Sequence, residues 1–507
     1  MVISRQSISF LSMIVPATLL VGAIVVRGQT RDDNRKRCGG DDPDWAIEAC
    51  SALIQSGQPS GNDLAKAFYG RGSAYARKGD YDRAIQDYAK TLRLSPRLAN
   101  AFYGRGWAYE HKGDYDHAIQ DFDGALRLNP RLAIALRERG LAYTYKGDYD
   151  HAIQDYDQAL LLNRNDTIGL YNRGLAFAHT GEYGRAIEDY DQAVQLNPNF
   201  ADAFAARGRA NKHKGDDDRA LQDYNKALRI NPSFADALSS RGLVYTDKGD
   251  FDRAMQDFDQ ALRVNPNSVD AYYGRGLAYG HKGNYDRAIE NYDQALKLDP
   301  KFSYAFYSRG GAYEHKGNYD RAIRDCDQAL RINPSYADAL IVRGNAYAAM
   351  REYDRAIQDF DQALRLNPKS ADAFYNRGLV YEEKGDYARA IPDYDQELTL
   401  KPSDADAFYG RGLAYSHKGD YDSAIRDFDQ ALRINPKYVT ALANRRAAYA
   451  RKGDYLRAIA DYEHLLWLRF GILGITIRLS ILAFAVVLAS RFNFKRFRKG
   501  PVTDQQL

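Results

Sequence analysis

The chain has 507 residues, with 45% hydrophobic and 27% charged side chains and a formal net charge of +4. Residues 1–40 and 470–507 carry twelve Lys/Arg against three Asp/Glu, so the body of the chain has a net charge of −5. A slightly acidic body has no net attraction for nucleic acid, which excludes nucleic acid from the expected partners.

The first 64 residues divide into an apolar and a polar stretch. Residues 8–26 are mostly apolar, so we expect residues 1–29 to be a signal peptide or an uncleaved N-terminal membrane anchor. Residues 30–43 are polar and charged, which predicts a linker. Residues 44–50 match the second half of the repeat described below, so we expect residues 30–64 to hold a linker and a half-repeat that caps the array.

The chain contains three cysteines. Cys38 and Cys50 lie twelve residues apart and outside the repeats, which suits a local disulfide in an oxidising compartment. The alternative is that they are two unrelated small residues. Cys326 occupies a position that is aromatic in the other repeats, which predicts a buried packing thiol rather than a nucleophile.

A unit of 34 residues recurs twelve times between residues 65 and 472 without an insertion. When each unit is numbered from 1 to 34, apolar and aromatic residues recur with helical spacing in both halves. Position 15 is glycine in eleven units and position 16 is Asp, Glu or Asn, which suits a turn followed by the N-cap of a second helix. Proline at position 32 ends that helix in ten units. Each unit is therefore expected to form a helical hairpin.

Small residues recur where the two helices of a unit would cross. The sixth unit has Gly242 at position 8 and Ala254 at position 20, with aromatic residues at positions 11 and 24. Glycine inside a helix costs about 1 kcal/mol, so its recurrence indicates a close crossing of the two backbones. The pattern resembles the tetratricopeptide repeat (TPR). The resemblance implies an all-α, right-handed α-solenoid of about twelve helix-turn-helix repeats over residues 65–472, with the first helices lining a concave groove.

Two positions depart from the usual pattern of that family. Position 7 is arginine in all twelve units, and position 23 is aspartate in eleven and Asn291 in the other. We expect a structural salt bridge within each repeat, for example between Arg241 and Asp257. The alternative is a ladder of arginines that binds phosphate or acidic ligands.

Histidine recurs at position 13 in six units, but successive units are a repeat width apart. That spacing is too wide for shared metal coordination at about 2.0–2.1 Å, so we expect polar residues in the last helical turn and no metal site. No Ser/His/Asp or Cys/His set stands apart from the repeat, and we expect no enzymatic activity, no cofactor and no small-molecule substrate. The six histidines are His111, His179, His213, His281, His315 and His417.

Repeats 5 and 10 deviate most from the pattern. Repeat 5 has Asn211 and Asp217 at aromatic positions, and repeat 10 has Pro392 at position 22. A proline there lacks a hydrogen-bond donor, so it should bend or fray the second helix. We expect these repeats to be soft joints, and the alternative is neutral drift in a redundant array.

The resemblance implies that positions 2, 5, 9, 12 and 13 face the groove. Position 5 is tyrosine in seven units and position 9 is leucine in six, and this strip suits an extended peptide or a partner helix. The alternative is that these side chains only pack between neighbouring repeats. The expected groove residues are Tyr69, Tyr103, Tyr171, Tyr273, Tyr307, Tyr375, Tyr409, Leu141, Leu175, Leu243, Leu277, Leu379 and Leu413.

The last repeat loses its proline, because Phe470 stands at position 32. The next stretch, residues 471–490, is apolar except for Arg478, and the tail of residues 491–507 is basic. We expect residues 471–490 to form a transmembrane helix with a cytoplasmic tail. The alternative is a helix in the plane of the membrane or a hydrophobic cap on the stack.

These features predict a bacterial, membrane-tethered scaffold that binds other proteins in its groove. The basic tail and the cysteine pair favour an array in the periplasm, anchored in the inner membrane. The basic residues after the first apolar segment favour the opposite topology, with a cytoplasmic array. The alternative function is a structural component of an envelope or secretion assembly, acting as a spacer and oligomerisation element.

Overall fold

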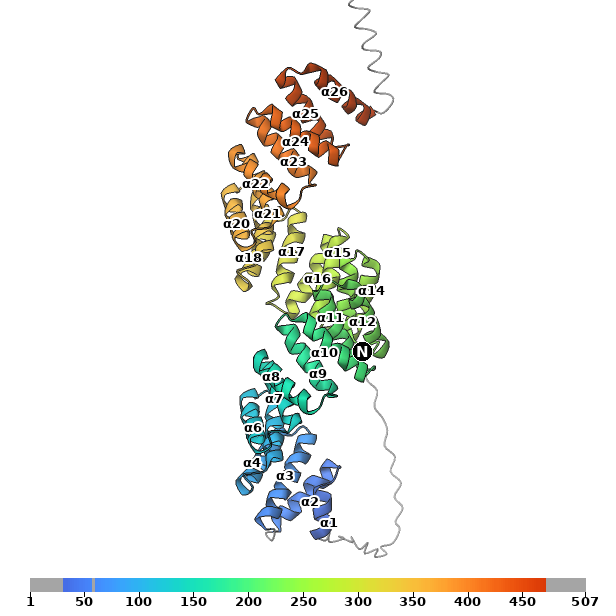
Figure 1. Ribbon diagram of the computed structural model, residues 1–507, viewed down its shortest axis with the longest axis vertical. Coiled ribbons are helices and arrows are strands. Elements are labelled where there is room, and N and C mark those ends of the chain that lie inside the picture. The colour runs from blue at the N-terminus through green and yellow to red at the C-terminus, as the bar shows by residue number, and fades with distance from the viewer. Residues whose placement is uncertain (1–30, 57–59, 471–507) are drawn as a thin grey trace, which may run out of the picture. The chain divides into compact units, whose positions relative to one another are not determined.

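The computed structural model describes residues 31–56 and 60–470, which form twenty-six helices and no strand (Figure 1). The chain divides into two compact units, Met1–Arg219 and Ala220–Leu507, with the boundary inside α12. The helices are α1 (Arg31–Cys38), α2 (Pro43–Gln55), α3 (Gly61–Arg77), α4 (Tyr81–Leu94), α5 (Ala99–His111), α6 (Tyr115–Leu128), α7 (Ala133–Lys146), α8 (Tyr149–Leu162), α9 (Thr167–His179), α10 (Tyr183–Leu196), α11 (Ala201–His213), α12 (Asp217–Ile230), α13 (Ala235–Asp247), α14 (Phe251–Val264), α15 (Val269–His281), α16 (Tyr285–Leu298), α17 (Ser303–His315), α18 (Tyr319–Ile332), α19 (Ala337–Ala349), α20 (Tyr353–Leu366), α21 (Ala371–Glu383), α22 (Tyr387–Leu400), α23 (Ala405–His417), α24 (Tyr421–Ile434), α25 (Val439–Lys452) and α26 (Tyr455–Phe470).

The turn inside each repeat forms as the sequence predicts. In the sixth repeat, Gly249 has a φ of 76°, a left-handed conformation that glycine adopts without strain. The carboxylate of Asp250 then accepts a hydrogen bond from the backbone N–H of Arg253 and caps α14. The same turn in repeat 9 has Arg351 in place of glycine, with a φ of 63°. The geometry of the turn is therefore kept even where its residue is unfavourable.

The two helices of a repeat cross closely at the small residues. A Cβ atom on Gly242 would lie 2.7 Å from the ring of Phe258, so only glycine fits at position 8 of this repeat. Ala254 and Phe258 have no exposed surface. In repeat 8 the Cys326 sulfur occupies the place of the aromatic ring and is likewise fully buried, which confirms the predicted packing thiol.

Within each unit, successive hairpins stack in chain order. The second helix of one repeat contacts the first helix of the next, as α18 contacts α19. Successive first helices also touch, as α17 touches α19 and α5 touches α7, whereas successive second helices of one unit do not touch in the described chain. The stack is therefore tighter on the side of the first helices, which form its inner surface. The right-handed sense of the solenoid stays a prediction.

The N-terminal cap contains more structure than the sequence indicated. Within the expected linker of residues 30–43, residues 31–38 form a helix, α1, which packs on α2 and α3. A disulfide joins Cys38 of α1 to Cys50 of α2, as one of the two alternatives predicted. Both cysteines are buried against Ala67 of the first repeat. Through this buried contact the otherwise charged α1 packs on the array. The cap is therefore a complete, crosslinked helical hairpin.

Two other expectations concern the atypical repeats and the apolar segments at the two ends of the chain. α22 runs without a break through Pro392, so the expected fraying of this helix is not observed. The role of repeats 5 and 10 as soft joints stays a prediction. The expected membrane segments, residues 1–29 and 471–490, lie outside the described residues, and within those residues no helix is long and apolar enough to cross a membrane.

Candidate protein-binding groove

The inner surface of the stack carries the residues that the sequence assigned to a groove. All thirteen tyrosine and leucine side chains at positions 5 and 9 are half-buried, so each keeps part of its surface open to solvent. They come from the first helices, which are the helices that contact one another along each unit. The structure therefore brings them to one side of each unit, where they form a discontinuous apolar strip.

Tyr273 shows how these tyrosines are held. The centre of its ring lies 6.0 Å from that of Tyr292 in the same repeat and 4.9 Å from that of Phe302. Its hydroxyl group is 3.4 Å from the Ser308 hydroxyl of the next repeat. Burial raises the pKa of the Tyr273 hydroxyl. The ring is thus held by neighbouring rings on two sides, and the rest of its surface is open to solvent on the inner side of the stack.

Tyr409 repeats this arrangement four repeats later. Its ring lies 6.0 Å from Phe428 and 5.1 Å from Tyr438, and its hydroxyl accepts a hydrogen bond from Asn444 of the next repeat at 3.0 Å. The sequence left open whether these tyrosines pack between repeats or face a groove. They do pack between repeats, and their half-exposed surface is what a partner can reach. Their part in recognition stays a prediction.

The arginine at position 7 joins two repeats, and the sequence predicted only one of its contacts. Arg241 donates from Nε to Asp257 Oδ2 at 2.7 Å and from Nη2 to Asp257 Oδ1 at 2.6 Å, which confirms the salt bridge within the repeat. Its Nη1 also donates to Asn225 of the preceding repeat at 2.6 Å. The hydrogen bonds to Asp257 raise the pKa of Arg241.

The contact between repeats recurs with aspartate at position 25. Arg309 binds Asp293 at 2.5 Å and Arg411 binds Asp395 at 2.6 Å, in addition to the aspartate of their own repeats. The recurrence of Asp at position 25 was the signal that could have revealed this contact. Because these arginines are engaged by protein carboxylates, the structure supports a structural role rather than a ladder for acidic ligands.

The histidines at position 13 also connect neighbouring repeats. The ring of His213 stacks on Tyr183 with centroids 4.7 Å apart and an angle of 3° between the planes. His417 stacks on Tyr387 with the same separation and an angle of 4°. Within residues 31–56 and 60–470, no group of three or more His, Cys, Asp or Glu side chains could hold a metal ion.

A buried acidic cluster lies on the inner side of the stack, and the sequence pattern did not predict it. Glu110, at position 12 of repeat 2, is 6% exposed, and its Oε2 has no hydrogen-bond partner in the described chain. Burial and the nearby charge of Glu138 raise the pKa of Glu110 to about 8. Arg137 replaces the tyrosine of position 5 and donates to Glu138 at 2.7 Å and to Asp166 at 3.2 Å. This departure at positions 5 and 6 was the available signal.

A cavity of about 550 Å³ lies where the cap meets the first repeat. It extends to Tyr69, the first of the groove tyrosines. Arg35, Lys66 and Arg77 line it, together with Asp63, whose carboxylate accepts a hydrogen bond from Arg35 at 2.6 Å. Basic groups are therefore in excess at the N-terminal end of the strip.

The chain is similar to several solved helical-repeat structures. The crystal structure of the APC/C hetero-tetramer Cut9–Hcn1 shares 17% identity over 82% of this chain and 95% of that chain, with a TM-score of 0.49. A tetratricopeptide repeat protein from Parabacteroides merdae shares 25% identity over 49% of this chain and 98% of that chain, with a TM-score of 0.41. MamA shares 32% identity over 32% of this chain and 96% of that chain, with a TM-score of 0.30.

No curated protein matches the sequence. Family comparison matches the tetratricopeptide repeat to residues 69–133, 137–199 and 341–405, and again to residues 269–302, 303–336 and 405–438. A further match, to the TPR repeat, covers residues 208–249 and 242–283. These matches cover more than half of the chain and agree with its register of helical hairpins, so the chain belongs to the tetratricopeptide repeat family.

Proposed function

We propose that this chain is a non-enzymatic scaffold that binds other proteins on the inner surface of its helical stack. The observation that supports this function most directly is the strip of half-buried tyrosine and leucine side chains on the first helices. Tyrosine offers a large contact area with little loss of conformational entropy, and its hydroxyl can bond a peptide backbone. The strip suits an extended peptide or an amphipathic helix.

The proposal includes a tether to a bacterial inner membrane through the apolar residues 471–490. Their length and the basic residues that follow them support a transmembrane helix with a cytoplasmic tail. The disulfide between Cys38 and Cys50 supports placing the array in an oxidising compartment, the periplasm. A cytoplasmic array is the alternative topology, and protease accessibility of the array in intact and permeabilised cells distinguishes the two.

Capture of partners by groove variants tests the scaffold function. The full-length chain and a variant with Tyr273→Ala and Tyr307→Ala are used to isolate bound proteins from membrane extracts. The matched control is Leu298→Ala with Ile332→Ala, which removes exposed apolar side chains from the second helices of the same two repeats. We expect partners to be lost only from the tyrosine variant, with the circular dichroism spectrum unchanged. Equal capture by all three proteins would contradict partner binding at the groove tyrosines.

A second candidate is a structural component of an envelope or secretion assembly. The uncovered surface of the last helix, α26, favours this role, because Leu456 is 84% exposed and Ile459 is 52% exposed. In that case the array sets a spacing and associates through its ends. Changes in α26 would then alter the size of the assembly, whereas the groove variant would leave it unchanged.

A further inference from the structure

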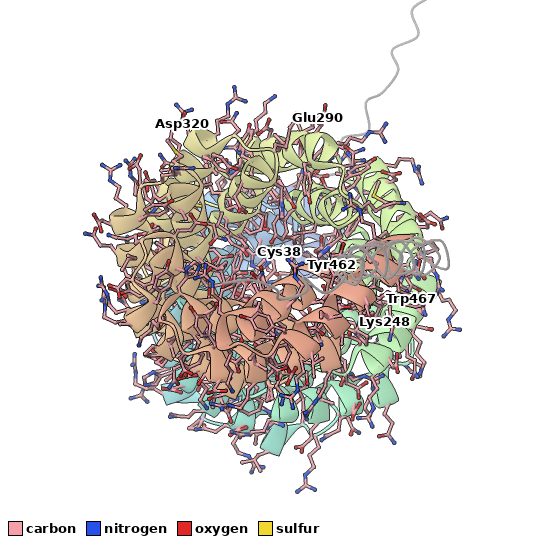
Figure 2. All side chains as sticks on the ribbon, turned by 90° about the horizontal axis from the view of Figure 1, so that it is seen from above. Cys38, Lys248, Glu290, Asp320, Tyr462 and Trp467 are labelled. Atoms are coloured by element: carbon pink, nitrogen blue, oxygen red, sulfur yellow. A yellow bond between two sulfur atoms is a disulfide. The ribbon has the colours of Figure 1, made fainter. Side chains whose placement is uncertain are left out.

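The last helix of the array has an apolar face that its counterparts in the other repeats lack. Tyr455, Leu456, Ile459 and Trp467 on α26 are exposed by 67%, 84%, 52% and 50%, respectively. Tyr462 is exposed by 48%; Figure 2 views the array from above with Tyr462 and Trp467 labelled. With 100° per residue, these five side chains occupy one continuous side of α26, which we call the α26 stripe.

Two residues of the stripe are exceptional for their positions in the repeat. Leu456 stands at position 18 and Trp467 at position 29, where the preceding repeat has Asp422 and Arg433. Both of those charged residues are exposed although a further repeat packs against their helix. A thirteenth hairpin in the usual register would therefore leave Leu456 and Trp467 uncovered. Because Leu456 and Trp467 are apolar, we expect a partner that covers more of α26 than a thirteenth hairpin would.

We infer that the α26 stripe lies in the interfacial layer of the lipid bilayer, alongside the point where the chain enters the membrane. The inference rests on the proposed tether, because residues 471–490 follow α26 directly. Tyr455, Tyr462 and Trp467 combine an apolar ring with a polar atom, which suits the boundary between headgroups and acyl chains. Leu456 and Ile459 add the aliphatic surface that an interfacial helix buries.

The polar residues of α26 lie on both sides of the helix, and one of them, the exposed Arg469, is next to Tyr462 at the edge of the stripe. Arg457 and His464 are exposed on the side of the helix opposite Tyr455, where they would face water. Glu463, which is half-buried, lies on the same side as the stripe and would remain at the level of the headgroups. The tether would then hold the array in a fixed orientation, because the chain meets the membrane through a helix face as well as through one segment.

Quenching of Trp467 by lipid tests this placement in the full-length chain. Trp45 and Trp107 are replaced by phenylalanine, which leaves Trp467 as the single reporter. The protein is reconstituted into vesicles of phosphatidylcholine and phosphatidylglycerol, with and without brominated acyl chains. We expect brominated lipid to reduce the Trp467 emission by roughly twofold, because interfacial side chains reach the acyl boundary.

The matched control moves the reporter one repeat back, with Arg433→Trp and Trp467→Phe in the same background. This tryptophan occupies position 29 of repeat 11 and should not be quenched. A second variant, Leu456→Asp with Trp467→Arg, gives α26 the residue types that the preceding repeat has at these positions, Asp422 and Arg433. It should still float with vesicles, but α26 should exchange its backbone amides faster than in the wild type.

The outcomes separate this inference from the tether on which it rests. A chain that does not float with vesicles contradicts the tether itself. A chain that floats but whose Trp467 is not quenched retains the tether and overturns the placement of α26. A blue-shifted emission without quenching also overturns it, because the stripe would then be covered by residues 471–490 or by a second copy.

Discussion

Arg343 and Asp359 form a two-pronged ion pair across the ninth repeat, with Nε donating to Oδ2 at 2.8 Å and Nη2 donating to Oδ1 at 2.6 Å. The remaining nitrogen of the same guanidinium, Nη1, donates to Asp327 of the preceding repeat at 2.5 Å. Asp359 is 5% exposed, whereas the side chain of Asp327 is 37% exposed. One arginine therefore stabilises a repeat through a buried carboxylate and a junction through an open one.

The buried contact of Arg343 should dominate its contribution to stability. Arg343→Met leaves the Asp359 carboxylate buried without its partner and is expected to cost about 3–5 kcal/mol. Asp327→Asn, which affects only the exposed contact, should cost about 1 kcal/mol or less. Urea denaturation followed by circular dichroism measures both. The double variant Arg343→Met with Asp359→Leu should recover most of the loss, and a further loss in that variant would contradict the account.

Two glycines in neighbouring first helices should respond to alanine with opposite signs. A Cβ atom on Gly274 would lie 2.4 Å from the ring of Phe258 in the preceding repeat, whereas one on Gly311 would meet nothing within 4 Å. Gly274→Ala is expected to destabilise the chain by about 1–3 kcal/mol because the junction is already filled. Gly311→Ala should stabilise it by about 0.5–1 kcal/mol. Equal effects in thermal denaturation would show that the junction is loosely packed.

The turn of repeat 9 should be improved by restoring the residue that other repeats carry. Arg351 has a φ of 63°, which costs a residue with a Cβ atom about 1 kcal/mol. Arg351→Gly is therefore expected to stabilise the chain by about that amount. The reciprocal control is Gly317→Ala at the same turn of repeat 8, where φ is 72°, and it should destabilise by a similar amount. Destabilisation by Arg351→Gly would reveal a contact of the arginine that outweighs its backbone strain.

The Glu110 carboxyl should make stability depend on pH near neutrality. Its pKa is raised to about 8 from an ordinary value of 4.5, by burial and by the charge of Glu138, against the opposing charge of Arg137. Between those pH values the folded chain holds a proton that the unfolded chain releases, so stability falls as pH rises through this window. Glu110→Gln removes this loss, and the variant should exceed the wild type at pH 8 by roughly 1–3 kcal/mol, at about 1.4 kcal/mol per pKa unit.

The control for Glu110 is Glu290→Gln, which changes an exposed glutamate on α16, labelled in Figure 2. Melting temperatures are measured from pH 5 to pH 9 for the wild type and both variants. Glu290→Gln should follow the wild-type profile, and Glu110→Gln should be flatter with little difference at pH 5. Parallel profiles for Glu110→Gln and the wild type would mean that the carboxyl ionises without a cost.

Local signals in the sequence were sufficient wherever one residue type has one physical consequence. Gly249 predicted the turn because glycine can adopt a positive φ, which the structure shows at this residue. Gly242 predicted the close helix crossing at Phe258. The pair of Arg241 and Asp257 followed from opposite charges at fixed positions in one hairpin. The contact of Arg241 with Asn225 was missed because it depends on how far one hairpin is shifted against the next.

In the cap and on the inner surface, too, some features depend on packing between elements and could not be predicted from the sequence. The composition of residues 31–38 favoured a linker, and only packing against α2 and α3, with the disulfide from Cys38, explains a helix there. The burial of Glu110 could not be predicted from a position that is polar in several repeats, and the charges of Arg137 and Glu138 act on it only because the next repeat packs alongside.

The sequence by itself determined the period, the two helices of each repeat and the turn that joins them, because these depend on residues less than 34 positions apart. Only the tertiary structure decided which groups meet between hairpins: the contact of Arg241 with Asn225 of the preceding repeat, the stacking of His213 on Tyr183, and the exposed stripe of α26. The physical reason is that a repeated pattern fixes every unit alike, whereas burial at a junction or an end depends on the neighbour that is present or missing.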